Sequence, residues 1–154
     1  MTTFKQSSGF SLVELVVIIL LLGILSAVAM PRFFDQSGFQ ERGLYDEVIA
    51  AVRYGQKLAV ASGCAVQVRL SSGGDAYGLY QRETDCTVGA FTRPVAEPAG
   101  GGAYRKNAAD DPAGLIPSVT ITFDSLGRSD VDGSYSIGSH SFSLVGETGY
   151  LAAP

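Results

Sequence analysis

The chain has 154 residues, a length that suits one small globular domain rather than two. Its formal net charge is −4, and the basic residues are scattered mostly singly along the sequence. This pattern excludes a global basic field that would attract nucleic acid. Apolar residues make up 46% of the chain, a share that one apolar run near the N-terminus inflates.

This apolar run covers residues 10–30. At the helical rise its length corresponds to roughly 31 Å, against about 30 Å for the hydrocarbon core of a bilayer. One carboxylate, Glu14, lies within it. An acid in the bilayer costs on the order of 2.5–3.5 kcal/mol, so an intramembrane carboxylate indicates a function and a partner. We therefore predict a transmembrane helix whose acid has a role.

A short polar leader, residues 1–9, precedes the run and carries Lys5. A signal peptidase could cut after the run, where small residues end it. A cut between Gly9 and Phe10 would instead keep the apolar helix on the product and expose a new amine on Phe10. That amine could pair with Glu14 of a neighbouring copy, and such a buried pair can set the register between packed helices.

The N-terminal segment resembles that of the type IV pilins and the type II secretion pseudopilins. The matching residues are Gly9, Phe10, Glu14 and a helix-perturbing pair, Gly23 and Pro31. The resemblance implies that a prepilin peptidase cuts after Gly9 and methylates the amine of Phe10, and that Glu14 guides the subunit into a helical filament. An ordinary signal anchor is the alternative.

Beyond the run, we expect residues 31–63 to continue the helix, with Pro31 bending it. From residue 44 to 61 apolar side chains recur at helical spacing, and Ser62-Gly63 supplies a stop. The stripe that we expect to cover a core comprises Leu44, Tyr45, Val48, Ile49, Val52, Leu58 and Ala59.

Two strand-like runs follow, residues 65–70 and 76–83, and are predicted to form a β-hairpin. Cys64 precedes the first run and Cys86 follows the second, so antiparallel pairing would bring the cysteines together. We predict a disulfide, worth about 3–3.5 kcal/mol in the chain-entropy model. Free thiols are the alternative, whereas two cysteines without nearby histidines cannot complete a zinc shell.

The remaining chain, within a β-rich domain predicted at residues 64–154, alternates strands and turns. Residues 94–117, rich in Pro, Gly, Ala and Asp, are predicted to be a long surface loop. One helix followed by strands is an α+β layout. With the resemblance, this predicts a pilin-like fold: a long N-terminal helix, transmembrane in its first half, packed on C-terminal antiparallel β-sheets. The predicted strands are residues 88–93, 119–123, 135–137, 141–145 and 149–151.

The C-terminal part, with F-D-S-L-G-R-S and E-T-G-Y around its last strands, is similar to the H-type minor pseudopilins and their fimbrial relatives. Residues 32–36 and 45–64 resemble the MshC-type minor pilin of the mannose-sensitive haemagglutinin (MSHA) pilus. This resemblance implies a minor subunit needed for biogenesis or initiation of an MSHA-like pilus or a type II pseudopilus. It would cross the inner membrane once, with its C-terminal domain in the periplasm, and its partners would be other pilin subunits, the prepilin peptidase and an inner-membrane assembly platform.

Two other functions compete with this one. A pilus-associated DNA-binding role in DNA uptake needs cations for phosphate contacts, yet residues 145–154 contain Glu147 and no Lys or Arg, so DNA binding is disfavoured. A tip adhesin acting through residues 94–117 is the other alternative.

Residues capable of catalysis or metal binding form no convincing constellation. His140, the single histidine, lies in a polar stretch without a nucleophile elbow, and we predict a solvent-facing or strand-edge position. Asp130 and Asp132 match part of a calcium loop that lacks its other ligands, so a turn of acids is favoured, with calcium a minor option. Asp110 and Asp111 are predicted to form a solvated turn. We expect neither enzymatic activity nor a cofactor or metal.

Overall fold

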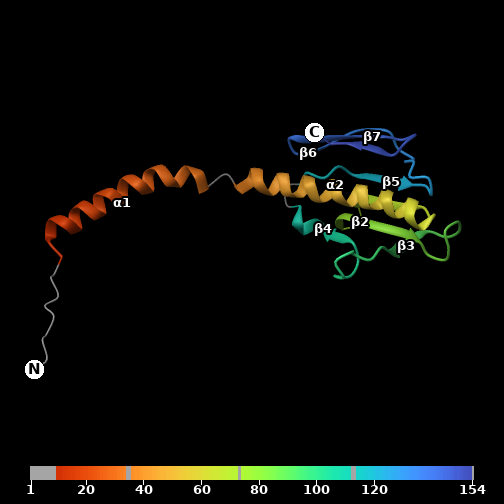
Figure 1. Cartoon of the computed structure of the whole chain (residues 1–154), viewed down its shortest axis with the longest axis horizontal. Coiled ribbons are helices and arrows are strands. Elements are labelled where there is room, and N and C mark those ends of the chain that lie inside the picture. Colours follow the sequence, from red (N-terminus) through yellow and green to blue (C-terminus); the bar gives the residue numbers. More distant parts are fainter. Residues whose placement is uncertain (1–9, 34–35, 73, 112–113, 154) are drawn as a thin grey trace, which may run out of the picture. The chain divides into compact units, whose positions relative to one another are not determined.

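The computed structural model describes residues 10–33, 36–72, 74–111 and 114–153, without the side chains of 27–33, 36, 37 and 72. It divides into two compact units, Met1–Phe39 and Gln40–Pro154. The leader with Gly9, the side chains at the end of the predicted membrane segment, and the side chain of Pro31 therefore lie outside the described residues. Helices come first and antiparallel strands follow, so the predicted α+β pilin-like fold class is confirmed (Figure 1).

The first unit contains helix α1, Leu12–Phe33. The run of Leu, Val and Ile residues favours a continuous helix, and the helix includes Gly23. Its bounds extend past Pro31, so the proline does not end it. Among the described residues, no helix combines the length and the hydropathy that crossing a membrane requires.

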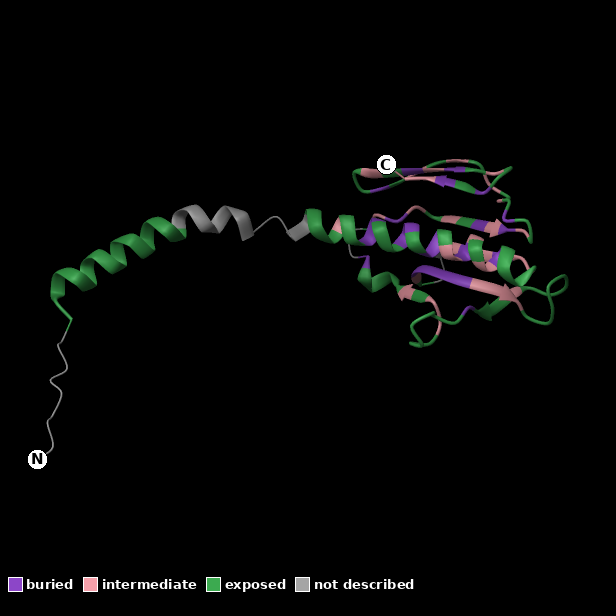
Figure 2. Ribbon diagram, viewed as in Figure 1, coloured by how far each residue is buried: buried purple, intermediate pink, exposed green. Residues whose placement is uncertain are grey.

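Helix α2, Gln36–Ser62, contains the predicted helical stretch 44–61. Its predicted stripe is buried, except that Leu58 is half-buried (Figure 2). Beyond the last helical residue, Gly63 has a φ of 66°, the left-handed conformation that commonly ends a helix. The stripe and the stop are therefore both confirmed.

A first sheet is built around the hairpin of β1, Val66–Ser72, and β2, Asp75–Arg82. Its strand order is β3-β2-β1-β5, and β4 also pairs with β2. Every pairing is antiparallel, and Val68 lies opposite both Leu79 and Ile121, all three of which are buried. The other strands are β3, Phe91–Pro94, β4, Arg105–Asn107, and β5, Val119–Phe123.

Residues 94–117 differ from the predicted surface loop. They contain β4 and a short 3-10 helix, Ala108–Asp110, and they place Val95 and Ile116 in the core. The predicted strand at 88–93 begins only at Phe91. The physical reason is that β4 is held by pairing with β2, a contact distant in sequence that local composition does not encode.

Asp111 also departs from its predicted position in a solvated turn. The residue is buried, with only 8% of its surface exposed. The two carboxylate oxygens accept hydrogen bonds from the backbone N–H groups of Leu115 and Ile116, at 2.9 and 3.1 Å. A buried carboxylate is tolerated there because both of its oxygens are satisfied.

A second sheet consists of β6, Gly133–Ile137, β7, His140–Val145, and β8, Tyr150–Ala152, in the order β6-β7-β8. The strands predicted at 135–137, 141–145 and 149–151 are confirmed. Alternate residues of this sheet point into the core, namely Ile137, Phe142, Leu144 and Leu151.

Helix α2 lies beside the second sheet (Figure 1). Hydrogen bonds join it to this sheet and to the loops next to it. The hydroxyl of Tyr45 donates to the carbonyl of Ser141 at 2.9 Å. The amide Nε2 of Gln56 donates to the carbonyls of Gly127 and Thr148, at 3.0 and 3.2 Å. These long-range bonds fix the helix while its apolar stripe fills the core.

The first sheet lies close to α2 at Gly55, which is buried. A Cβ atom at this position would lie 2.6 Å from Cγ2 of Val68, with Leu79 and Phe123 also within van der Waals range. A residue without a side chain therefore lets the helix backbone lie against β1.

The structure joins Cys64 to Cys86 in a disulfide, in agreement with the predicted pairing. Cys64 follows α2 and begins the approach to β1, whereas Cys86 lies in the loop after β2. The bond ties the end of the helix to the open end of the hairpin.

Candidate functional site

Helix α1 is apolar on every side. All described side chains from residue 10 to residue 26 are exposed within the chain (Figure 2). A helix that is hydrophobic all round is stable only in apolar surroundings, so this surface requires other molecules around it. The exposed large residues of α1 include Leu12, Val13, Leu15, Val16, Ile18, Ile19, Leu20, Leu22, Ile24 and Leu25, and Phe10 just before the helix is exposed as well.

Glu14 is the sole ionisable side chain among described residues 10–26. It lies in the first turn of α1, where the backbone N–H of Leu15 donates to the carbonyl of Ser11 at 3.1 Å. A carboxylate in the first turn is favoured by the positive end of the helix dipole. In apolar surroundings it would in addition need a cation or hydrogen-bond donors from another molecule.

The predicted site residues are divided between the units. Phe10, Glu14 and Gly23 lie in the first unit, while Gly9 and the side chain of Pro31 lie outside the described residues. A Cβ atom at Gly23 would meet nothing within 4 Å, so packing among the described residues does not explain this glycine. The kink assigned to Gly23 and Pro31 stays a prediction.

A cluster that sequence reasoning missed connects α2 to the turn between β6 and β7. Oε1 of Glu41 accepts hydrogen bonds from the backbone N–H and the hydroxyl of Ser139, and lies 3.2 Å from Nδ1 of His140. The ring of His140 packs on Tyr45 with centroids 5.1 Å apart. Hydrogen bonding lowers the pKa of the Glu41 carboxyl. The largest effect comes from the Ser139 hydroxyl, and smaller ones come from the Ser139 backbone N–H and from His140.

This cluster corrects the position predicted for His140. The residue does begin β7, but its side chain is only 27% exposed and packs against α2. The Ser139 hydroxyl donates to the Glu41 carboxylate at 2.6 Å, so its proton is already held and the hydroxyl is not poised as a nucleophile. The group therefore fastens the second sheet to the helix.

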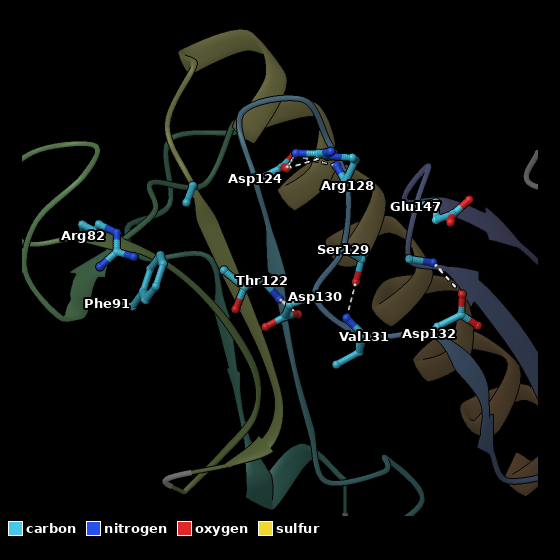
Figure 3. A pocket seen from close by; sticks show the side chains of 12 residues that line it. Arg82, Phe91, Thr122, Asp124, Arg128, Ser129, Asp130, Val131, Asp132 and Glu147 are labelled. Atoms are coloured by element: carbon cyan, nitrogen blue, oxygen red, sulfur yellow. Dashed lines mark hydrogen bonds and ion pairs between the residues drawn. The ribbon is translucent and has the colours of Figure 1, made fainter.

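A surface pocket of about 760 Å³ contains the acids considered as calcium ligands (Figure 3). Oδ1 of Asp130 accepts the backbone N–H of Thr122 at 2.6 Å, and Oδ2 of Asp132 accepts that of Gly146 at 2.9 Å. Each carboxylate is thus bound to a different segment, Asp130 to strand β5 and Asp132 to the turn after β7. Among the described residues, no group of three or more potential ligands is placed to hold a metal ion.

Comparison with known proteins finds a short N-terminal motif and a partial similarity to a pilin. Residues 4–30 match the family described as the prokaryotic N-terminal methylation motif. The chain is also 39% identical over 54 residues to the type IV narrow pilus major component PilA5 of Thermus thermophilus. The aligned part is 35% of this chain and 47% of the relative, so the chain spans about half the length of the curated relative that it matches. No solved structure matches the chain.

An exposed apolar helix with an acid in its first turn, followed by antiparallel β-sheets, is the arrangement of a pilin-like fold. The methylation motif and the similarity to PilA5 point in the same direction as the fold. The chain is similar to the type IV pilins in this motif and over 54 of its residues.

Proposed function

We propose that this chain is a minor structural subunit needed for the biogenesis or initiation of an MSHA-like type IV pilus or a type II secretion pseudopilus. The observation that carries the proposal is Glu14, an isolated acid in the first turn of an apolar helix exposed on all sides. Its position within the matched methylation motif supports the same conclusion. The subunit acts by assembly and catalyses no reaction.

Processing comes first in this proposal. A prepilin peptidase cuts between Gly9 and Phe10 and methylates the new amine of Phe10. The product keeps α1 and crosses the inner membrane once, with the C-terminal unit in the periplasm. The disulfide between Cys64 and Cys86 supports an oxidising compartment for that unit, because cytosolic thiols are kept reduced.

Assembly follows when α1 leaves the lipid for a bundle of similar helices. The apolar side chains remain buried throughout, so the hydrophobic cost of leaving the membrane is offset by equivalent burial in the filament. Glu14 gains the amine of Phe10 on a neighbouring subunit, with an inner-membrane assembly platform as the site of insertion. Charge pairing of this kind favours one axial register over others.

A mutational test separates assembly from insertion. We expect Glu14→Gln to leave the chain in the membrane fraction but to remove it from filaments sheared off the cells. Ser26→Ala is the matched control, because Ser26 is the other polar side chain among residues 12–26 of α1, and its hydroxyl donates to the carbonyl of Leu22 in the same helix at 2.7 Å. Normal incorporation of Glu14→Gln would contradict the pairing.

The minor role is tested separately by stoichiometry. Its support is the resemblance of the C-terminal part to H-type subunits, whereas the matched relative is named a major component. Quantitative mass spectrometry of sheared filaments should find this chain at a small fraction of the principal subunit. An abundance equal to that of the principal subunit would overturn the minor role and leave the family assignment intact.

A further inference from the structure

A second surface pocket, of about 410 Å³, lies where α2 meets β2 and β4. Two tyrosine rings help to line it, Tyr77 from β2 and Tyr104 from the segment before β4. Their ring centroids are 6.3 Å apart, and Tyr54 of α2 stacks on Tyr104 with centroids 5.2 Å apart and nearly parallel planes. Tyr54 does not line the pocket, and its stacking helps to hold the Tyr104 ring in place.

The Tyr77 hydroxyl is available to a ligand. Tyr77 is only 8% exposed, yet its hydroxyl has no hydrogen-bond partner in the described part of the chain. In the described part of the chain, Arg82 Nε is a side-chain polar atom that is both fully enclosed and unpaired. The Tyr77 hydroxyl is unpaired but not fully enclosed, so it keeps access to solvent. In a residue this deeply buried, a polar atom without a protein partner calls for one from outside.

The charges around the rings are unbalanced. Glu47 lines the pocket and forms an ion pair with Lys106, so these two groups largely neutralise each other. Glu97 also lines the pocket, and no ion pair involves it within the described residues. Its backbone is held by the Glu97–Gly102 turn, in which the Glu97 N–H donates to the Gly102 carbonyl at 2.8 Å. One carboxylate is therefore left without a counter-charge beside the tyrosines.

Arg105 contributes to the lining but not as that counter-charge. Register pairs Lys106 with Tyr77 and Arg105 with Gly78. Successive residues of a strand point to opposite faces, so the Arg105 side chain lies on the face opposite Tyr77. The pKa values of the two tyrosines agree with an excess of negative charge in the pocket. Burial, and to a smaller extent the charge of Glu47, raises the pKa of Tyr77 to about 12. Burial, and to a smaller extent the charge of Glu97, raises the pKa of Tyr104.

We propose that this pocket binds an alkylammonium group, held by the carboxylate of Glu97, the hydroxyl of Tyr77 and the ring of Tyr104. Tyrosine rings attract cations through their π-systems, and a nearby carboxylate adds direct charge attraction. A primary ammonium, as on a lysine side chain, and a quaternary one, as on choline, share the attraction to the carboxylate and the ring, but only the primary ammonium can donate a hydrogen bond to the Tyr77 hydroxyl. The site belongs to the C-terminal unit and is independent of Glu14.

The test uses the full-length chain in a non-ionic detergent, with tyrosine rings labelled by ¹³C for NMR titration. The probes are n-butylammonium, choline and 3,3-dimethylbutanol, a neutral molecule of the same shape as choline. We expect the Tyr77 and Tyr104 signals to shift on addition of at least one cation. The cation that binds shows whether the pocket takes a lysine-like or a choline-like group. The neutral alcohol should leave them unchanged.

Variants decide which groups hold the cation. Glu97→Gln should weaken the binding of either cation about 5-fold, the effect of losing one partly exposed charge. Tyr77→Phe should weaken the binding of n-butylammonium about 5-fold, the effect of losing one hydrogen bond. Glu83→Gln is the matched control, because Glu83 is exposed and lies outside the pocket lining, and it should bind like the original chain. Equal binding of the alcohol, no binding of either cation, or no effect of Glu97→Gln would overturn the proposal.

Discussion

Two glycines of α2 provide a controlled test of how the helix packs on the first sheet. Gly55 is buried, and a Cβ atom there would lie 2.6 Å from Cγ2 of Val68. Gly43 is exposed, and a Cβ atom there would meet nothing within 4 Å. Replacing each by alanine adds the same methyl group to the same helix, so the two variants differ only in what the methyl meets.

The magnitude follows from the contact at Gly55. The added methyl would be about 0.8 Å closer to Val68 than the 3.4 Å at which ordinary contact begins. Val68 is fully buried in β1 and, being β-branched, has little freedom to rotate away. Overpacking of this kind costs about 1–3 kcal/mol. Both variants gain up to about 1 kcal/mol of helix propensity, which cancels in their comparison.

The measurement is the free energy of unfolding in urea, followed by circular dichroism in a non-ionic detergent. We expect Gly43→Ala to be stabilised by about 0.5–1 kcal/mol. Gly55→Ala should be about 1–3 kcal/mol less stable than Gly43→Ala. Equal stabilities for the two variants would refute the close approach of α2 to β1.

Three further predictions concern side chains that fasten the C-terminal unit. Replacing Cys64 and Cys86 together by serine should cost about 3–3.5 kcal/mol of unfolding free energy, the loop entropy of their 22-residue separation, and an unchanged urea midpoint would contradict it. Asp111→Ala should cost about 1–3 kcal/mol because the part-buried N–H of Leu115 and the buried N–H of Ile116 lose their acceptor; a loss below the measurement error would show that they find other partners. The hydrogen bonds from Ser139 lower the pKa of Glu41 below its ordinary 4.5, so the stabilisation from Glu41 is present above pH 4.5 and is lost as the pH falls through the folded value. Glu41→Gln should therefore be less stable than the original chain at pH 7 and similar to it at pH 3, and a difference that does not change with pH would count against this cluster.

The elements that could be predicted from the sequence are those whose signal is local. The stripe of α2 follows from helical spacing, and the hairpin follows from two short runs around a Ser/Gly turn. The disulfide is a consequence of that hairpin, because antiparallel pairing returns its outer ends to one another. Glu14 could be singled out because a charge within an apolar run is conspicuous without any knowledge of the fold.

What could not be predicted depends on contacts between distant segments. β4 lies in a stretch whose Pro and Gly content indicates a loop, and only its pairing with β2 makes it a strand. The Tyr77–Tyr104 pocket exists because of that same pairing, so no local pattern pointed to it. His140 looked like a surface residue because its partner, Glu41, is 99 residues away in the sequence.

The central claim is that the chain is cut before its apolar helix and keeps that helix for assembly. The most direct measurement is mass spectrometry of the N-terminal peptide of protein isolated from cell membranes. Our account predicts a first residue of Phe10 carrying an added methyl group. A protein that still begins at Met1, or one that begins after residue 30 without the apolar helix, would contradict it.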